Sequence, residues 1–119
     1  MIAWWGSAVE CASALARLER SGALAAGLAS QSFARLDALA SSWFEIEPVA
    51  LVKETARRFL RVHDLRAGDA LQLAAAFVAA EGRPSSLRIV CLDQRLVVAA
   101  QREGFDVLDG ERLGGDLTA

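Results

Sequence analysis

Cysteine and histidine are both scarce in this sequence, and their scarcity excludes two classes of protein. The 119 residues contain two cysteines, Cys11 and Cys91, and one histidine, His63. Two distant cysteines that form no CxxC pair are too few for the disulfide framework of a small secreted domain, and they fit the reducing cytoplasm. With one histidine and no His/Cys cluster, nothing indicates a zinc site. We therefore expect a cytoplasmic protein without structural zinc.

Long apolar runs and common catalytic motifs are also missing. No apolar run reaches the roughly 18 residues that a membrane span needs, and the opening MIAWWGSAVE lacks the basic start and long apolar centre of a signal peptide. The motifs GxGxxG, GxxxxGK[ST], GxSxG and HExxH do not occur. The formal net charge of −2 gives no overall indication of nucleic-acid binding. We expect no association with a membrane.

The residues that are present describe a globular α/β protein. Hydrophobic residues make up 54% of the chain and charged residues 24%, and the length is sufficient for one buried core. Strand-like and helix-like segments alternate, which predicts a mostly parallel sheet covered by helices on both faces. We therefore expect one domain over residues 1–119 with three layers, α/β/α.

The hydrophobic pattern also gives approximate bounds for these segments. Strands are expected at 1–5, 44–48, 87–93 and 105–108, of which the first and third should be buried. Helices are expected at 7–20, 30–43, 49–63 and 94–104, with another helix beginning at residue 69 and a frayed tail from residue 110. In the helix at 49–63, one apolar face should point to the core. That face comprises Val49, Val52, Ala56, Phe59 and Leu60.

Three acidic residues at the starts of helices are the candidate site, although each also fits a structural role. Glu10 follows Ser7 by three residues, which is the spacing of a capping box. Asp69 and Asp93 stand where aspartate commonly caps a helix. Each acid taken alone therefore leaves the choice between a helix cap and a functional group open.

Their shared position favours a functional role. Glu10 and Asp93 each follow a strand directly, and ligands of open α/β sheets bind at the carboxyl ends of the strands. Asp69 reaches the same edge if its helix packs alongside. Three converging carboxylates would raise one another's pKa unless a cation neutralised them, and an all-oxygen ligand set suits Mg²⁺ or Mn²⁺.

Three segments carry a resemblance to a known family. They are SAVECASALARLERSG with Glu10, LRAGDALQLAAA with Asp69, and IVCLDQRLVVAAQREGFDV with Asp93. In these segments and their order the chain resembles the PIN domain, and within that family the VapC-type toxins of bacterial toxin–antitoxin pairs. Glu10, Asp69 and Asp93 match the second, third and fourth acids of the family pattern.

Two departures from the pattern concern the first acid and Cys91. The family's first acid lies in a D-[ST]-S-A-L segment, which MIAWWGSAVE does not contain. The opening resembles the family's second strand, so we expect an N-terminal truncation of a strand and a helix, roughly thirty residues. Met1 would then be an internal methionine, or the chain a degenerate copy. Cys91 stands where the family usually has Thr or Ser.

The resemblance implies a metal-dependent endoribonuclease toxin. Mg²⁺ or Mn²⁺, held by Glu10, Asp69 and Asp93, would lower the pKa of a water molecule for attack on an RNA phosphodiester. The expected partners are the RNA substrate, a cognate antitoxin protein and a second copy of the chain in a homodimer.

Arginines are the candidate contacts to RNA phosphates, namely Arg17, Arg66 and Arg95. Each also fits a solvent-facing or structural role. Two alternatives to the enzyme stand beside it. One is a catalytically impaired remnant of the PIN fold that binds the antitoxin, and the other is an α/β scaffold in which the acids only cap helices.

Overall fold

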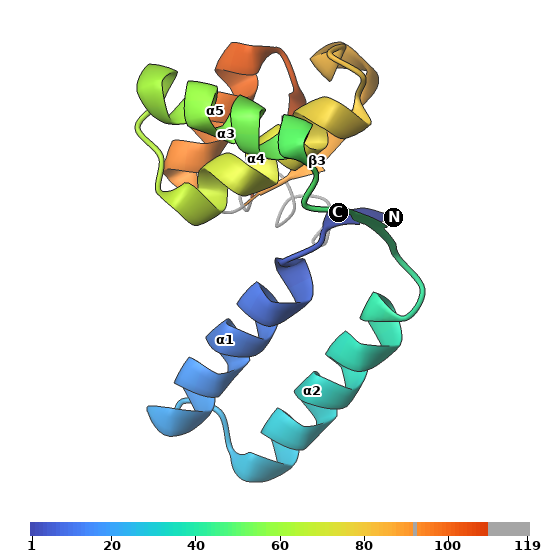
Figure 1. Ribbon diagram of the computed structural model, residues 1–119. Coiled ribbons are helices and arrows are strands. Elements are labelled where there is room, and N and C mark those ends of the chain that lie inside the picture. The colour runs from blue at the N-terminus through green and yellow to red at the C-terminus, as the bar shows by residue number, and fades with distance from the viewer. Residues whose placement is uncertain (92, 110–119) are drawn as a thin grey trace, which may run out of the picture. The chain divides into compact units, whose positions relative to one another are not determined.

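The chain folds into two compact units, which are described separately. The computed structural model describes residues 1–91 and 93–109, and Figure 1 shows the course of the chain. Unit 1 comprises Met1–Glu47 and unit 2 comprises Pro48–Ala119. The expected frayed tail from residue 110 lies outside the described residues. One domain over residues 1–119 stays a prediction.

The described residues have an α/β composition with five α-helices and short parallel strands. The elements in chain order are β1 (Ile2–Trp4), α1 (Ser7–Arg20), α2 (Ala26–Ala40), β2 (Phe44–Ile46), α3 (Ala50–Val62), α4 (Ala67–Ala79), the short 3-10 helix η1 (Pro84–Ser86), β3 (Arg88–Val90), α5 (Gln94–Glu103) and β4 (Asp106–Leu108). None of these helices is both long enough and apolar enough to cross a membrane.

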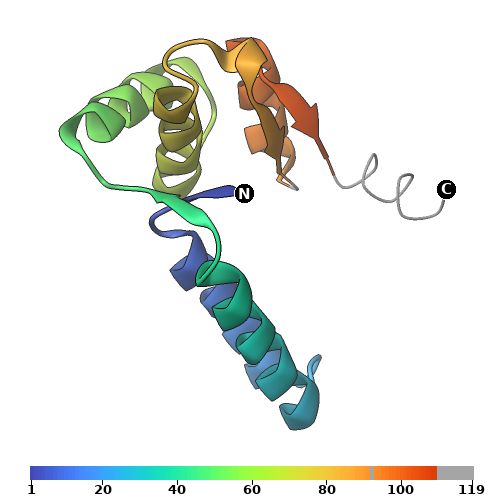
Figure 2. The same cartoon turned by 90° about the vertical axis from the view of Figure 1, so that its right-hand side faces the viewer.

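Unit 1 is a helical hairpin joined to a parallel pair of strands. Helices α1 and α2 lie side by side in both views (Figures 1 and 2), and β1 pairs with β2 so that Ile2 lies opposite Phe44. The turn from β1 into α1 needs glycine at position 6, because a Cβ there would lie 2.7 Å from Nε1 of the Trp4 indole. Trp4 is buried in this turn, whereas Trp5 is exposed.

The hairpin leaves much apolar surface exposed. Helix α1 contains no buried residue, and α2 buries only Ala29 and Leu36. Several large apolar side chains of the two helices are exposed, namely Val9, Leu18, Leu28 and Leu39. The hairpin is therefore held by contacts between its two helices without a large core of its own.

Unit 2 has a closely packed core built from three helices and the strand pair β3–β4. Phe59 of α3 is fully buried, and its ring lies edge-on to that of Phe77 in α4, with 5.6 Å between the centroids. Helix α4 is rich in alanine, which lets the neighbouring helix approach closely. Strand β3 pairs in parallel with β4, and Arg88 bonds Asp106 across the pair at 2.9 Å. Gly104 ends α5 with a φ of 101°, a conformation that favours glycine.

Most predicted elements are found, but several details of the prediction were wrong. Within the described residues each unit has one parallel pair of strands, β1–β2 in unit 1 and β3–β4 in unit 2, and the single sheet of a three-layer fold stays a prediction. The helix expected at 30–43 spans Ala26–Ala40. Strand β3 is not buried, since Val90 is 60% exposed, and Leu92 of the expected strand lies outside the described residues.

The core face of α3 was predicted correctly in part. Val52, Ala56 and Phe59 are buried as expected, whereas Val49 and Leu60 are exposed. Thr55 takes a buried position instead, which it can occupy because its hydroxyl donates to the Leu51 carbonyl at 2.7 Å.

Candidate acidic site in unit 2

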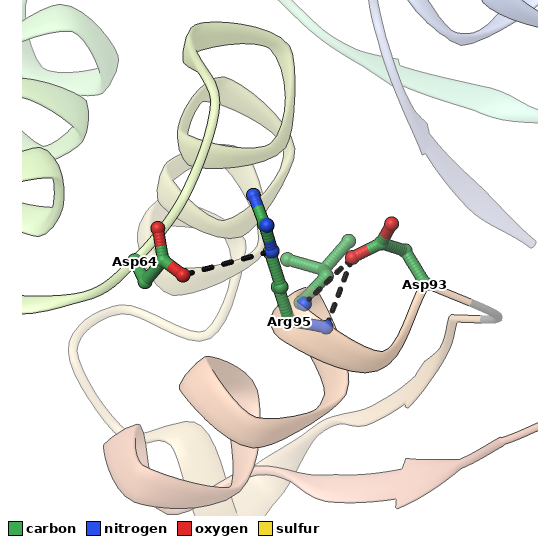
Figure 3. A network of polar contacts seen from close by, with 4 residues as sticks. Asp64, Asp93 and Arg95 are labelled. Carbon is green, nitrogen blue, oxygen red and sulfur yellow. Dashed lines mark hydrogen bonds and ion pairs between the residues drawn. The ribbon is translucent and has the colours of Figure 1, made fainter.

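Asp93 caps the N-terminus of α5, as one of the two interpretations of this residue predicted. Its Oδ1 accepts hydrogen bonds from the backbone N–H groups of Arg95 at 3.0 Å and Leu96 at 3.1 Å (Figure 3). Its Oδ2 has no hydrogen-bond partner among the described residues. One carboxylate can therefore hold the helix terminus with one oxygen and face a ligand with the other.

Asp69 is not an N-cap, so that interpretation was wrong. Helix α4 begins at Ala67 with Arg66 as its N-cap, and no side chain caps it. Asp69 lies within the first turn, where its negative charge still interacts favourably with the helix N-terminus. Because its carboxylate is not needed to complete the helix end, the structural explanation for an acid at this position is weaker than the sequence suggested.

The Asp69 carboxylate lies in an environment that disfavours its negative charge. Burial raises its pKa above the ordinary value of 3.8, and the nearby carboxylate of Asp93 raises it further. The guanidinium groups of Arg66 and Arg95 act in the opposite direction without cancelling these effects. Asp69 and Asp93 are therefore electrostatic neighbours, as the sequence analysis expected, and their combined charge is not fully neutralised by the two arginines.

Cys91 shows that a further acid belongs to this region. Burial raises the pKa of its thiol to about 11, and Asp109, Asp93 and Asp69 raise it in that order. The backbone N–H of Cys91 donates to the Leu108 carbonyl at 3.1 Å, so the carboxyl ends of β3 and β4 are adjacent. Cys91 is thus a buried thiol that is influenced by three carboxylates and is protonated at neutral pH when no metal is bound.

Arg95 lies between the two acids Asp64 and Asp93 (Figure 3). Its Nε is 3.6 Å from Oδ2 of Asp64, and the two side chains are 57% and 85% exposed. A contact of this length between exposed groups is weak and easily exchanged for another partner. The structure therefore leaves Arg95 able to pair with an incoming anion.

Glu10 and Arg17, the other residues predicted for the site, belong to α1 of unit 1. Ser7 is not the N-cap that the capping-box interpretation of Glu10 requires, because Gly6 holds that position and Ser7 is the first helical residue. The backbone N–H of Glu10 donates to the Gly6 carbonyl at 3.0 Å. Arg17 lies in the last turn of α1 and is exposed.

The ligand set in unit 2 fits a hard cation better than a soft one. Asp69 and Asp93 offer carboxylate oxygens, and a cation beside them would favour the charged form of Asp69, whose pKa burial and Asp93 raise. Across residues 1–91 and 93–109, no group of three or more His, Cys, Asp and Glu side chains is arranged to hold a metal ion. The two aspartates are the residues of this unit that could hold Mg²⁺ or Mn²⁺.

Sequence reasoning missed two acids of this region. Asp109 directly follows β4, and its place after a strand parallel to β3 is the signal that could have identified it. Asp64 lies in the loop before α4, where nothing in the sequence predicted its contact with Arg95.

Comparisons with known proteins add no relative to this description. A scan against protein-family models, a search of curated proteins and a search of solved structures each returned no match to the chain. The resemblance to the PIN domain therefore rests on the sequence motifs around Glu10, Asp69 and Asp93.

Proposed function

We propose that the chain is a Mg²⁺- or Mn²⁺-dependent endoribonuclease with a three-layer, PIN-like fold, related to the VapC-type toxins. One observation carries the proposal. The carboxylate of Asp69 has a raised pKa because it is partly buried and because Asp93 is close, and two arginines, Arg66 and Arg95, act on the same carboxylate. Adjacent carboxylates can hold a divalent cation that assists the cleavage of a phosphodiester, and arginines beside them can bind its phosphate.

The two aspartates have the role of holding the cation. Asp93 suits this role because two backbone N–H groups at the start of α5 donate to its Oδ1. These bonds fix the orientation of the carboxylate and leave Oδ2 available to a cation. Asp69 is carried by the first turn of α4, whose buried residues Ala70 and Leu73 fix that helix in the core. A bound Mg²⁺ or Mn²⁺ supplies a water of lowered pKa and offsets charge on the phosphate.

The arginines have the role of binding and orienting the RNA backbone. Arg66 and Arg95 flank the acids, and planar guanidinium groups suit paired hydrogen bonds to phosphate oxygens. The prediction that Glu10 is a third ligand, and that Arg17 contacts RNA, rests on the sequence alone. A cognate antitoxin and a homodimer are the partners that the resemblance implies.

A second candidate function is a protein-binding module without catalysis. It is favoured by the exposed apolar residues of the α1–α2 hairpin, such as Val9 and Leu28, which a partner protein could cover.

Cleavage of RNA by matched variants tests the enzyme proposal. Wild type, Asp69→Asn and the control Asp37→Asn, whose carboxylate is exposed on α2, are incubated with labelled single-stranded RNA in Mn²⁺ and in EDTA. We expect cleavage by the wild type and by Asp37→Asn in Mn²⁺ only, and none by Asp69→Asn.

The opposite pattern has a definite meaning. Equal cleavage by Asp69→Asn would show that the measured nuclease does not use this site. A folded wild type that cleaves no RNA in Mn²⁺ would favour the protein-binding alternative.

A further inference from the structure

A groove beside the acidic site runs along one face of α5. It has a volume of about 270 Å³, and its wall on α5 includes Gln94, Arg95, Val98 and Arg102. Asp64, from the loop that follows α3, contributes to the opposite wall. Arg95 and Arg102 are seven residues apart, which places them on the same helix face about 10 Å apart along the axis.

The groove has a net positive charge that is available to a ligand. Arg102 has no ion-pair partner among the described residues, and Arg95 makes only the weak contact of 3.6 Å with Asp64. The nearest further acid, Glu103, is already bound to His63, since Nε2 of the imidazole lies 2.6 Å from its Oε2. The groove is therefore lined by two guanidinium groups, and the carboxylate on its opposite wall, that of Asp64, is only weakly paired.

The form of the groove points to a strand and not to a small anion. A site for one free phosphate would have donors that converge on a point, whereas these two charges are spread along a helix. Val98 lies between them and offers an apolar surface, on which a sugar or base can pack. Arg95 lines the groove and also acts electrostatically on Asp69, so the groove and the acidic site have this residue in common.

From this geometry we infer that the groove binds the backbone of the RNA strand next to the bond that is cut. A phosphate oxygen takes the place of the Asp64 carboxylate at Arg95, and a phosphate farther along the strand is bound by Arg102. The inference rests on the proposed function, because it takes the strand at Asp69 and Asp93 to be RNA. It adds Arg102 to the residues that bind the substrate, and it gives Asp64 the role of a carboxylate that competes with the substrate for Arg95.

Binding of RNA in the absence of metal tests this inference separately from cleavage. Fluorescence anisotropy of a labelled ten-nucleotide RNA in EDTA is measured over a range of salt concentrations for wild type, Arg102→Gln and the control Arg83→Gln. Arg83 is also exposed, and its contact with Glu81 is 3.7 Å long, so it matches Arg102 in charge and accessibility but lies outside the groove.

We expect Arg102→Gln to weaken binding roughly fivefold, which is the contribution of one exposed charge contact. The slope of log K against log salt should fall by about 0.7, because one phosphate contact is lost. Arg83→Gln should match the wild type in both respects. A second variant, Asp64→Asn, should bind RNA more tightly than the wild type, because the carboxylate that competes for Arg95 is gone.

The outcomes separate the groove from the nuclease. A thermal melt first checks that Arg102→Gln is folded. If the folded variant binds RNA like the wild type, or if the wild type does not bind RNA, the groove is not an RNA-binding site. This holds even where Asp69 is needed for cleavage. Complete competition by inorganic phosphate at millimolar concentration would also refute it, in favour of a single-anion site. If Arg102→Gln loses affinity while the wild type cleaves nothing in Mn²⁺, the groove stands and the nuclease proposal falls.

Discussion

Replacing Asp93 by asparagine or by alanine separates its structural role from its chemical role. Asparagine caps helices about as well as aspartate, so Asp93→Asn keeps an oxygen that accepts from the N–H groups of Arg95 and Leu96. It removes the negative charge that a cation needs. Alanine removes both the cap and the charge. A difference between the two variants in stability, with none in activity, is therefore expected.

The magnitude follows from the two hydrogen bonds at the start of α5. Loss of an N-cap side chain costs about 1 kcal/mol of stability, which corresponds to a fall in melting temperature of about 4 °C for a domain of this size. Asp93→Asn should remain close to the wild type. It loses a favourable interaction with the helix N-terminus of about 0.3–1 kcal/mol and gains from the removal of repulsion with Asp69.

Thermal melting by circular dichroism and RNA cleavage in Mn²⁺ measure the two roles independently. We expect Asp93→Ala to melt at a lower temperature than the wild type, Asp93→Asn to melt close to it, and both variants to have lost cleavage. An alanine variant as stable as the wild type would refute the cap. Full cleavage by the asparagine variant would reduce Asp93 to a cap alone.

Three further changes test the electrostatics and the core of unit 2. The folded-state pKa of Asp69 lies above its ordinary value of 3.8, so the contribution of Asp69 to stability is lost as the pH rises from 3.8 through the folded pKa. In urea denaturation, the free energy of unfolding of Asp69→Asn relative to that of the wild type should therefore be higher at pH 7 than at pH 3. The pKa of the buried Cys91 is raised to about 11, so iodoacetamide at pH 8 should alkylate the exposed Cys11 first, and peptide mass spectrometry showing equal rates would contradict this burial. Phe59→Ala should lower the free energy of unfolding by about 3–5 kcal/mol, because Phe59 is fully buried. Leu60→Ala should lower it far less in the same denaturation experiment, because the neighbouring Leu60 is 42% exposed.

The sequence predicted the elements of this chain better than their packing. The helices Ser7–Arg20 and Gln94–Glu103 were predicted within one residue, because Gly22 and Gly104 follow them closely and both adopt positive φ. The start of α4 was misplaced because an acid before an apolar run resembles an N-cap, while the chain already turns at Arg66. The pairing of β1 with β2 and of β3 with β4 depends on contacts between residues distant in the sequence, which the hydrophobic pattern does not specify.

The candidate site was also predictable in part. The proximity of Asp69 and Asp93 follows from their positions at a strand end and a helix start, and the raised pKa of Asp69 agrees with it. In Asp93, Oδ1 accepts two hydrogen bonds from the helix N-terminus and Oδ2 has no partner among the described residues. The sequence could not predict this arrangement, because it does not specify the orientation of the side chain. Nor could the groove of α5, since it depends on the loop at Asp64 lying opposite Arg95.

Paramagnetic broadening by Mn²⁺ in the NMR spectrum of the ¹⁵N-labelled protein tests most directly whether Asp69 and Asp93 hold a divalent cation. Our account predicts that substoichiometric Mn²⁺ broadens amide signals around both aspartates, including those of Ala70 and Gln94, and that Asp69→Asn abolishes this broadening while Asp37→Asn preserves it. Broadening confined to other acids, or unchanged by the removal of the Asp69 charge, would contradict the account.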